Sequence, residues 1–144
     1  MNILVAYESR KGHTRQAAEA IATAAREQGG EVIVRPIKEL QAADVEQADV
    51  LFVGTWLRGF ILFGVRPVAA KRIVAALPSL ADKPAGIFCT YAVNPRGALR
   101  KLRTLLESRG ADVQAERAFQ RDRPGEAVGP FVRTVVEAAG TMSR

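Results

Sequence analysis

The residues with the clearest chemical potential form a short loop near the start of the chain. An apolar run from Ile3 to Tyr7 leads into this loop, and a helical pattern that begins near Thr14 follows it. The loop contributes two hydroxyls, two cations, one glycine and the chain's only histidine, from Ser9, Arg10, Lys11, Gly12, His13 and Thr14. A strand that enters a helix through such a loop brings unpaired backbone N–H groups and the positive helix end to one point. The pattern therefore predicts an anion site, most often a phosphate site.

Two common nucleotide-binding loops do not fit the sequence. The Gly-x-x-x-x-Gly-Lys spacing of a Walker A loop is missing, and no Gly-x-Gly-x-x-Gly follows the first apolar run. The predicted phosphate site is therefore neither a P-loop nor a dinucleotide fingerprint.

The elements that must position this loop alternate between strand and helix patterns. The expected strands are Ile3–Tyr7, Glu31–Pro36, Val50–Val53, Ala85–Thr90 and Ala111–Phe119. The expected helices are Thr14–Gln28, Val68–Leu77, Arg96–Arg109 and Pro130–Ala139, with Ile37–Asp49 as a short mixed crossover. Such alternation predicts an α/β protein with a parallel, doubly wound sheet. We expect one domain, 1–144, because this length is enough for one sizeable core.

The N-terminal pattern resembles the FMN phosphate signature of flavodoxins. The resemblance rests on Tyr7, Ser9, Gly12, Thr14, Ala18 and Ile21, and Ala6 departs from it, because the family usually has a larger apolar residue there. It implies a flavodoxin-like three-layer sandwich with a five-stranded parallel sheet of order 2-1-3-4-5, and FMN as cofactor. In such a fold, ligands bind at the carboxyl ends of strands near the reversal of strand order.

This rule predicts that the loops after the third and fourth predicted strands also belong to the site. By the resemblance, flavin contacts are expected from Thr55, Trp56, Leu57 and Arg58 in the first loop, and from Thr90, Tyr91, Ala92, Asn94 and Gly97 in the second. An aromatic side chain such as Trp56 can cover a flat flavin ring by stacking. Each loop also has a simpler interpretation: Trp56 packs on a neighbouring helix, and Asn94 with Gly97 makes an ordinary turn.

Several features depart from the family pattern. Typical flavodoxins are strongly acidic, whereas this chain has a net charge of +6 and a pI near 10.1. Leu57 follows the tryptophan where the family commonly has glycine, and Arg58 stands where an acidic residue often follows. Positive φ angles cost leucine more than glycine. The basic balance favours an acidic redox partner protein. Nucleic acid is a weaker candidate, since acidic residues interrupt the basic cluster and the chain has no known nucleic-acid motif.

The amino-acid composition limits which cellular compartment and which cysteine or metal chemistry we expect. One cysteine excludes an internal disulfide, and one cysteine with one histidine cannot build a structural zinc site. We expect Cys89 to be a small buried hydrophobe. No apolar run reaches membrane-spanning length and none resembles a signal peptide, so we expect a cytoplasmic protein.

Three functions from different classes remain open at this stage. The chain is an FMN electron carrier, a small FMN oxidoreductase acting on a quinone or porphyrinogen, or a flavodoxin-fold interaction module without cofactor. For the oxidoreductase, the apolar loop Phe60–Val65 would receive the substrate or touch a membrane surface. Ser9, Gly12, Thr14 and Trp56 argue against the module, because a protein without cofactor does not need them together.

Overall fold

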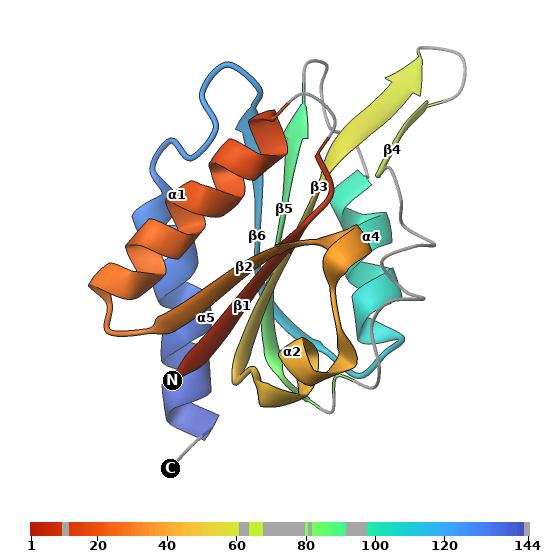
Figure 1. Cartoon of the computed structure of the whole chain (residues 1–144). Helices are drawn as coiled ribbons and strands as arrows, with labels where there is room; N and C mark the ends of the chain where they lie inside the picture. Colours follow the sequence, from red (N-terminus) through yellow and green to blue (C-terminus); the bar gives the residue numbers. More distant parts are fainter. Residues whose placement is uncertain (10–11, 61–63, 68–79, 81, 92–97, 143–144) are drawn as a thin grey trace.

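A parallel sheet forms the centre of the computed structural model, which describes residues 1–9, 12–60, 64–67, 80, 82–91 and 98–142. Five strands follow the spatial order β2-β1-β3-β5-β6, and every neighbouring pair among them is parallel (Figure 1). Their bounds are β1 Asn2–Tyr7, β2 Glu31–Pro36, β3 Val50–Phe60, β5 Pro84–Tyr91 and β6 Asp112–Gln120. This is the expected order 2-1-3-4-5, with β4 as an addition beside β3, so the fold-class prediction is confirmed.

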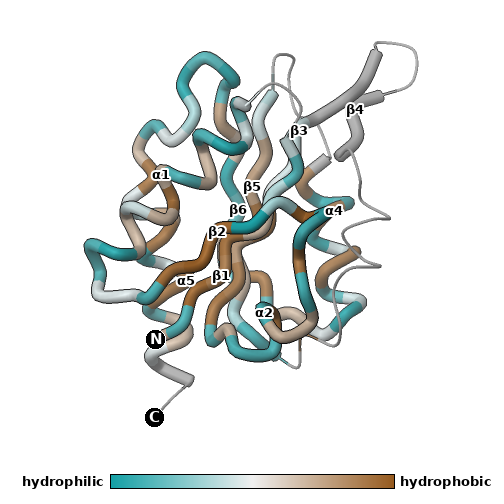
Figure 2. Tube along the Cα trace, in the orientation of Figure 1, coloured by the Kyte–Doolittle hydropathy of each residue, from teal (hydrophilic) through white to brown (hydrophobic). Residues whose placement is uncertain are grey.

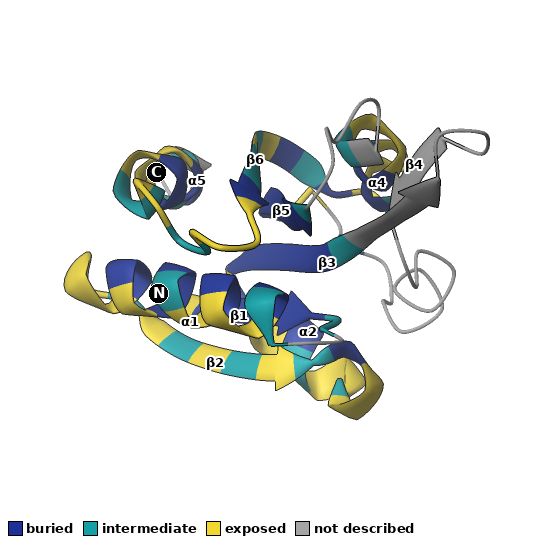
Figure 3. Cartoon of the chain, turned by 90° about the horizontal axis from the view of Figure 1, so that it is seen from above, coloured by how far each residue is buried: buried dark blue, intermediate teal, exposed yellow. Residues whose placement is uncertain are grey.

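Helices cover both faces of the sheet. The helices are α1 His13–Glu27, α2 Ala42–Gln47, α4 Ala98–Glu107 and α5 Val128–Met142, and a 3-10 turn, η1, spans Ile37–Glu39. Helices α1 and α5 lie on one face, while α2 and α4 lie on the other (Figures 1 and 3). The result is the three-layer sandwich that the sequence predicts. Among the described residues, no helix combines the length and the apolar character that crossing a membrane would need.

Two apolar cores hold the layers together, one on each face of the sheet. Alternate residues of β3 divide between them: Phe52 belongs to the core under α1 and α5, while Leu51 and Val53 belong to the core under α2 and α4. Phe52 meets Phe131 of α5 edge to face, with ring centroids 5.5 Å apart. Apolar residues accordingly concentrate in the central strands, which are buried on both sides (Figures 2 and 3).

The structure corrects the prediction for the third strand. We expected a strand over Val50–Val53 and a loop after it, but β3 continues to Phe60 and pairs antiparallel with β4, Gly64–Pro67. Gly54 lies inside the strand, and glycine is required there because a Cβ would come within 2.2 Å of the Phe88 ring. Beyond Gly54, the β-favouring Thr-Trp-Leu sequence extends the strand.

The other element predictions agree with the structure to within a few residues at their ends. The crossover after β2 is short and mixed as expected, and consists of η1 and α2. The last helix is longer than expected, because it begins at Val128 instead of Pro130 and continues to Met142. The predicted helix Val68–Leu77 lies outside the described residues.

Lys83 fastens the short helix α2 to the start of β5. Its Nζ donates hydrogen bonds to the carbonyl oxygens of Val45, Glu46 and Ala48, at 2.6, 3.1 and 2.8 Å. These carbonyls belong to the end of α2, where intrahelical partners run out and the helix dipole is negative. A single cation therefore satisfies the exposed end of a helix that has only six residues.

Replacing Lys83 with Met should lower the free energy of unfolding by about 1–3 kcal/mol, because the carbonyls lose a charged donor while the apolar stem is kept. Urea unfolding followed by circular dichroism measures the change. The matched control is Lys101→Met on the exposed face of α4, which should stay within about 0.5 kcal/mol of the parent. Equal effects of the two substitutions would contradict the capping role of Lys83.

Candidate functional site

The predicted phosphate loop forms a tight turn between β1 and α1. Gly12 stands at the N-cap of α1 with φ 89°, a left-handed conformation that side chains rarely adopt. Its N–H donates to Ser9 Oγ at 3.1 Å, and its carbonyl accepts the first helical hydrogen bond, from the Gln16 N–H at 3.0 Å. The amides of the first turn of α1 have no intrahelical acceptor by their position. The loop thus offers backbone donors at a positive helix end.

The end of β1 is bound closely to β3. Tyr7 stands opposite Gly54 in the parallel register, and the Glu8 N–H donates to the Gly54 carbonyl at 3.0 Å. Because neighbouring parallel strands carry their carboxyl ends to the same edge, the loop after β1 lies beside the part of β3 that carries Thr55 and Trp56. The two segments that the sequence assigned to one site therefore meet.

A buried pair of hydroxyls joins helix α1 to strand β5. Thr14 Oγ1 and Thr90 Oγ1 lie 2.7 Å apart, and the two residues are 1% and 3% exposed. One hydroxyl donates to the other in this pair, so the second proton remains available to a further acceptor. Residues 76 positions apart in the sequence are thus locked together at the carboxyl edge.

Trp56 occupies the same edge. It stands opposite Thr90 in the register between β3 and β5 and is partly buried, whereas Thr55 is fully buried. The Thr55 hydroxyl donates to the Trp56 carbonyl at 3.3 Å. The indole therefore belongs to an ordered strand at the edge of the sheet, instead of the loop that we expected there.

The predicted site residues divide into three groups. The structure brings Ser9, Gly12, His13, Thr14, Thr55, Trp56, Thr90 and Tyr91 to the carboxyl edge of β1, β3 and β5. Leu57 and Arg58 belong to β3, where it pairs with β4. Arg10, Lys11, Ala92, Asn94 and Gly97 lie outside the described residues. His13 is the first residue of α1 rather than a loop residue.

A hollow of about 590 Å³ borders the phosphate loop at the carboxyl ends of β1 and β2. Its lining includes Ser9 and Gly12, which we predicted, and Arg15 and Lys38, which we did not. The lining is completed by Tyr7, Glu8, Pro36 and Glu39. Lys38 follows the end of β2, so the rule that parallel strands end at one edge was the signal that would have placed it here. The positive charges of Arg15 and Lys38 are balanced in this lining by Glu8 and Glu39, and Arg15 also pairs with Glu19 at 3.2 Å.

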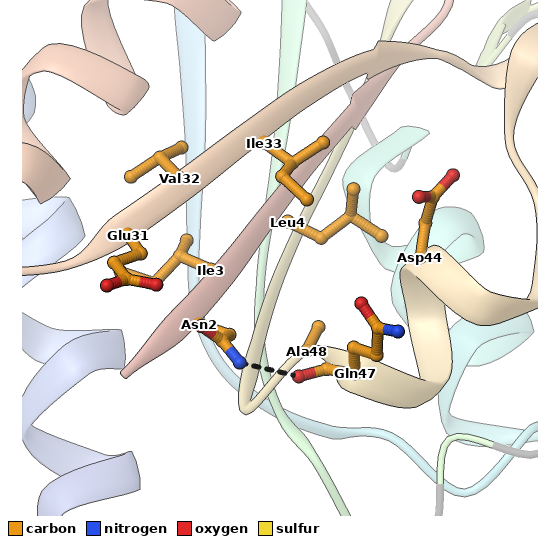
Figure 4. Close-up of a pocket in the computed structure, with 9 residues that line it drawn as sticks. All are labelled: Asn2, Ile3, Leu4, Glu31, Val32, Ile33, Asp44, Gln47 and Ala48. Carbon is orange, nitrogen blue, oxygen red and sulfur yellow. Dashed lines mark hydrogen bonds between the residues drawn. The ribbon is translucent and has the colours of Figure 1, made fainter.

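A second hollow lies at the opposite end of the sheet. Its volume is about 350 Å³, and Figure 4 shows its lining between the first residues of β1 and β2 and helix α2. Apolar Leu4 and Ile33 meet polar Asp44 and Gln47 there, and the Asn2 side chain donates to the Gln47 carbonyl. Doubly wound folds bind ligands at the carboxyl ends of their strands, so this hollow is not part of the candidate site.

Cys89 lies next to the candidate site, and its thiol is unreactive near neutral pH. The thiol is fully buried on β5, and burial, together with the nearby Glu116 carboxylate, raises its pKa to about 12. The reactive form of cysteine is the thiolate, which is scarce near neutral pH at such a pKa. The expectation of a small buried hydrophobe is confirmed. The described residues also contain no group of histidine, cysteine and carboxylate side chains that could hold a metal ion.

The fold and the edge geometry together define a doubly wound α/β protein with a phosphate-type loop at its topological switch point. The family model described as the flavodoxin domain matches residues 4–106 of this chain. The chain therefore belongs to the flavodoxin family, as the N-terminal signature predicts.

Solved structures have the same fold at low sequence identity. A flavodoxin from the domain Archaea is 17% identical with a TM-score of 0.74, and each chain is covered over its whole length. The two-electron reduced flavodoxin of Megasphaera elsdenii is 22% identical with a TM-score of 0.75, over 96% of this chain and 98% of that one. Rubredoxin oxygen:oxidoreductase from Desulfovibrio gigas is 18% identical with a TM-score of 0.76, over 97% of this chain but only 36% of that one. A comparison with curated proteins finds no match.

The hydroxyl pair can be tested by a double-mutant cycle. Thr14→Val and Thr90→Val should each lower the free energy of unfolding by about 1–3 kcal/mol, because each leaves a buried hydroxyl without its partner. The double variant should lose less than the sum, by about 0.5–1.5 kcal/mol, since it removes both polar groups. Urea unfolding provides the values, with Thr23→Val on the exposed side of α1 as the control. Strict additivity would mean that the two hydroxyls are satisfied independently.

Proposed function

We propose that this chain binds FMN at the carboxyl edge of β1, β3 and β5 and serves as a redox protein. The observation that carries the proposal is the meeting of a phosphate-type loop with the Thr14–Thr90 pair and Trp56 at one edge. When bound, FMN would supply reversible uptake of electrons. The chain's own residues would bind its phosphate, orient its ring and keep that ring next to the protein surface.

The donors at the loop suit a terminal phosphate. Ser9 Oγ accepts from the Gly12 N–H, so its own proton is available to a ligand oxygen. Thr14 or Thr90 has a second available proton, and the first turn of α1 contributes amides and the positive end of its dipole. Such charge-assisted hydrogen bonds are about twice as strong as neutral ones. We infer that Arg10 and Lys11 add charge compensation near this loop.

The ring of the flavin is proposed to contact Trp56 on one side. Trp56 lies opposite Thr90 in the register, so a ring over the edge would extend between β3 and β5. Thr55, Leu57, Arg58 and Tyr91 belong to the same two strands and are further proposed contacts. Ala92, Asn94 and Gly97 remain proposed contacts from the segment that follows β5.

Electron transfer between protein partners, or to a small acceptor, is the function that we favour within this proposal. Its support is the signature, the family model over residues 4–106 and the fold, which matches flavodoxins over 96–100% of the chain. A cytoplasmic location and an acidic partner protein belong to the same proposal. The oxidoreductase and the cofactor-free module remain the alternatives, and the expected substrate loop Phe60–Val65 includes residues outside the described part of the chain.

The visible spectrum of the purified protein tests the proposal most directly. We expect a yellow protein from which heat or acid releases FMN, identified by chromatography. A colourless protein that takes up no FMN in a titration would contradict the proposal and leave the interaction module. Turnover of a quinone or porphyrinogen by the loaded protein would instead favour the oxidoreductase.

Removing the hydroxyls at the proposed phosphate loop should weaken the binding of FMN and leave the binding of riboflavin unchanged. The double substitution Ser9→Ala with Thr14→Val should weaken the binding free energy of FMN by about 1–3 kcal/mol for each charge-assisted hydrogen bond that is lost. Riboflavin lacks the phosphate, so its affinity should hardly change. Flavin titrations below the unfolding transition give both affinities, and Thr23→Val on the same helix is the matched control. Equal losses for the two ligands would place the phosphate elsewhere.

Stacking on Trp56 should quench the emission of bound flavin. Trp56→Ala should restore that emission and lower flavin affinity by about 1–3 kcal/mol, because stacking and apolar burial are lost. Trp56→Phe keeps an aromatic ring and should retain most of the affinity. Unchanged flavin emission together with a large loss of protein stability would show that Trp56 packs inside the protein instead.

A further inference from the structure

Strand β2 lies at one end of the sheet and has a free backbone edge. Among the described residues, β2 pairs only with β1. The Glu31 N–H donates to the Met1 carbonyl at 2.9 Å, so the N–H and C=O groups of every second residue, from Glu31 onward, point toward β1. Those of Val32 and Val34 point away from the sheet, and no group in the described part of the chain bonds to them. An edge of this kind can pair with a further strand.

The side chains of β2 form one packed face and one exposed face. Val32 and Val34 pack against the core under α1. Glu31, Ile33 and Arg35 are exposed on the side of α2, and Figure 3 shows this alternation along the strand. Ile33 is 42% exposed, one of two large apolar side chains that the structure describes as exposed. It borders the hollow of about 350 Å³ between α2 and the start of β1 and β2 (Figure 4). An apolar side chain is therefore uncovered at the middle of the free edge.

The two charges of the exposed face are opposite in sign and symmetric about Ile33. Glu31 lies two residues before Ile33, and Arg35 lies two residues after it. The Arg35 guanidinium is 3.5 Å from the Asp44 carboxylate, yet its side chain stays 45% exposed. Glu31 forms no ion pair with another described residue. Charges on an edge strand usually discourage pairing, but one negative and one positive charge match each other when a copy of the same strand runs in the opposite direction.

A second copy of β2, antiparallel to the first and centred on Ile33, fits this edge at each position. Glu31 of each copy then stands opposite Arg35 of the other, as a two-fold axis requires. Val32 of each copy stands opposite Val34 of the other, and their outward N–H and C=O groups bond each other. The two Ile33 residues form a non-hydrogen-bonded pair, in which Cα atoms are about 4.5 Å apart and side chains meet. Any shift of register separates both charge pairs, so the charges select this one.

We propose that this chain forms a symmetric dimer in which β2 pairs antiparallel with β2 of a second copy and the two sheets become one. Pro36 ends the paired segment because it has no N–H. Such a short contact buries little area, so we expect a dimer that forms at about 100 μM protein and dissociates at about 1 μM. The proposed ring site lies on β3 and β5, away from β2 in the strand order. The dimer therefore leaves that site open, and the inference goes beyond the proposed function and does not depend on it.

Reversal of single charges tests the register, with sedimentation equilibrium as the measurement. Glu31→Arg places arginine opposite Arg35 of the second copy, and Arg35→Glu places glutamate opposite Glu31. Each variant alone should dimerise about tenfold more weakly than the parent, because attraction becomes repulsion at both ends of the strand pair. The control Arg133→Glu reverses an exposed charge on α5 and should change dimerisation by less than about twofold.

An equimolar mixture of Glu31→Arg and Arg35→Glu should dimerise as well as the parent. Each strand of the mixed dimer meets the opposite charge at both positions, as in the parent. Each substitution changes the net charge of +6 by two units, so both variants remain positive and attraction between whole chains does not explain the recovery. Recovery in the mixture also shows that both variants are folded.

A disulfide across the two-fold axis provides a second measurement. Ile33→Cys places two thiols at the central non-hydrogen-bonded pair, where the Cα separation suits a disulfide. Oxidation of this variant at about 100 μM protein should give a covalent dimer on a non-reducing gel. Arg133→Cys is the matched control, since it places an exposed thiol on α5. Cys89 should not interfere, because its thiol is buried and burial raises its pKa to about 12.

Several outcomes would overturn the proposed dimer. One is a parent protein that stays monomeric up to about 1 mM. Another is a dimer that Glu31→Arg weakens no more than Arg133→Glu does, because such a dimer uses a different surface. Failure of the mixed variants to associate, or disulfide formation by Ile33→Cys no faster than by Arg133→Cys, would exclude the register. Flavin titration of the parent is read separately: failure of FMN to bind contradicts the proposed function and leaves the dimer standing.

Discussion

The parallel register of β1, β3 and β5 is the constraint on which the rest of the candidate site depends. It sets Tyr7 opposite Gly54 and Trp56 opposite Thr90, so the ends of three strands reach one edge of the sheet. The buried bond between Thr14 and Thr90 then fixes the start of α1 against this edge. A helix N-terminus without that attachment would still attract anions, but it would not have a fixed position relative to an aromatic side chain. Position, more than residue type, makes this edge a candidate site for a large planar cofactor.

Close packing explains why a glycine lies inside the central strand. Gly54 lets the Phe88 ring approach the backbone of β3, and the strand continues past the sheet edge into the hairpin with β4. The extension carries Trp56 as part of an ordered strand and places Arg58 one strand period beyond it. In this chain, the third strand of the flavodoxin fold is therefore extended, and β4 pairs antiparallel with the extension.

The fold does not require the net positive charge of this chain. The flavodoxin family is shown by the family model and the fold, yet typical members are acidic and this chain has a net charge of +6. Solvation of helix faces accounts for many of its charged residues, as the ion pairs of Arg15 with Glu19 and Arg103 with Glu107 illustrate.

The sequence by itself determined the fold class, the alternation of strands and helices and the loop between β1 and α1, because each depends on local patterns. Each of these patterns lies within a few neighbouring residues. Examples are the apolar runs, the helix end at Gly29 and Gly30, and the spacing of Ser9, Gly12 and Thr14. The tertiary structure decided what depends on distant neighbours. Gly54 lies inside β3 against the Phe88 ring, although the sequence predicts a strand end before it, and the pairing of Thr14 with Thr90 joins residues 76 positions apart. Arg15 and Lys38 line one hollow only because the parallel strand ends bring separate segments together.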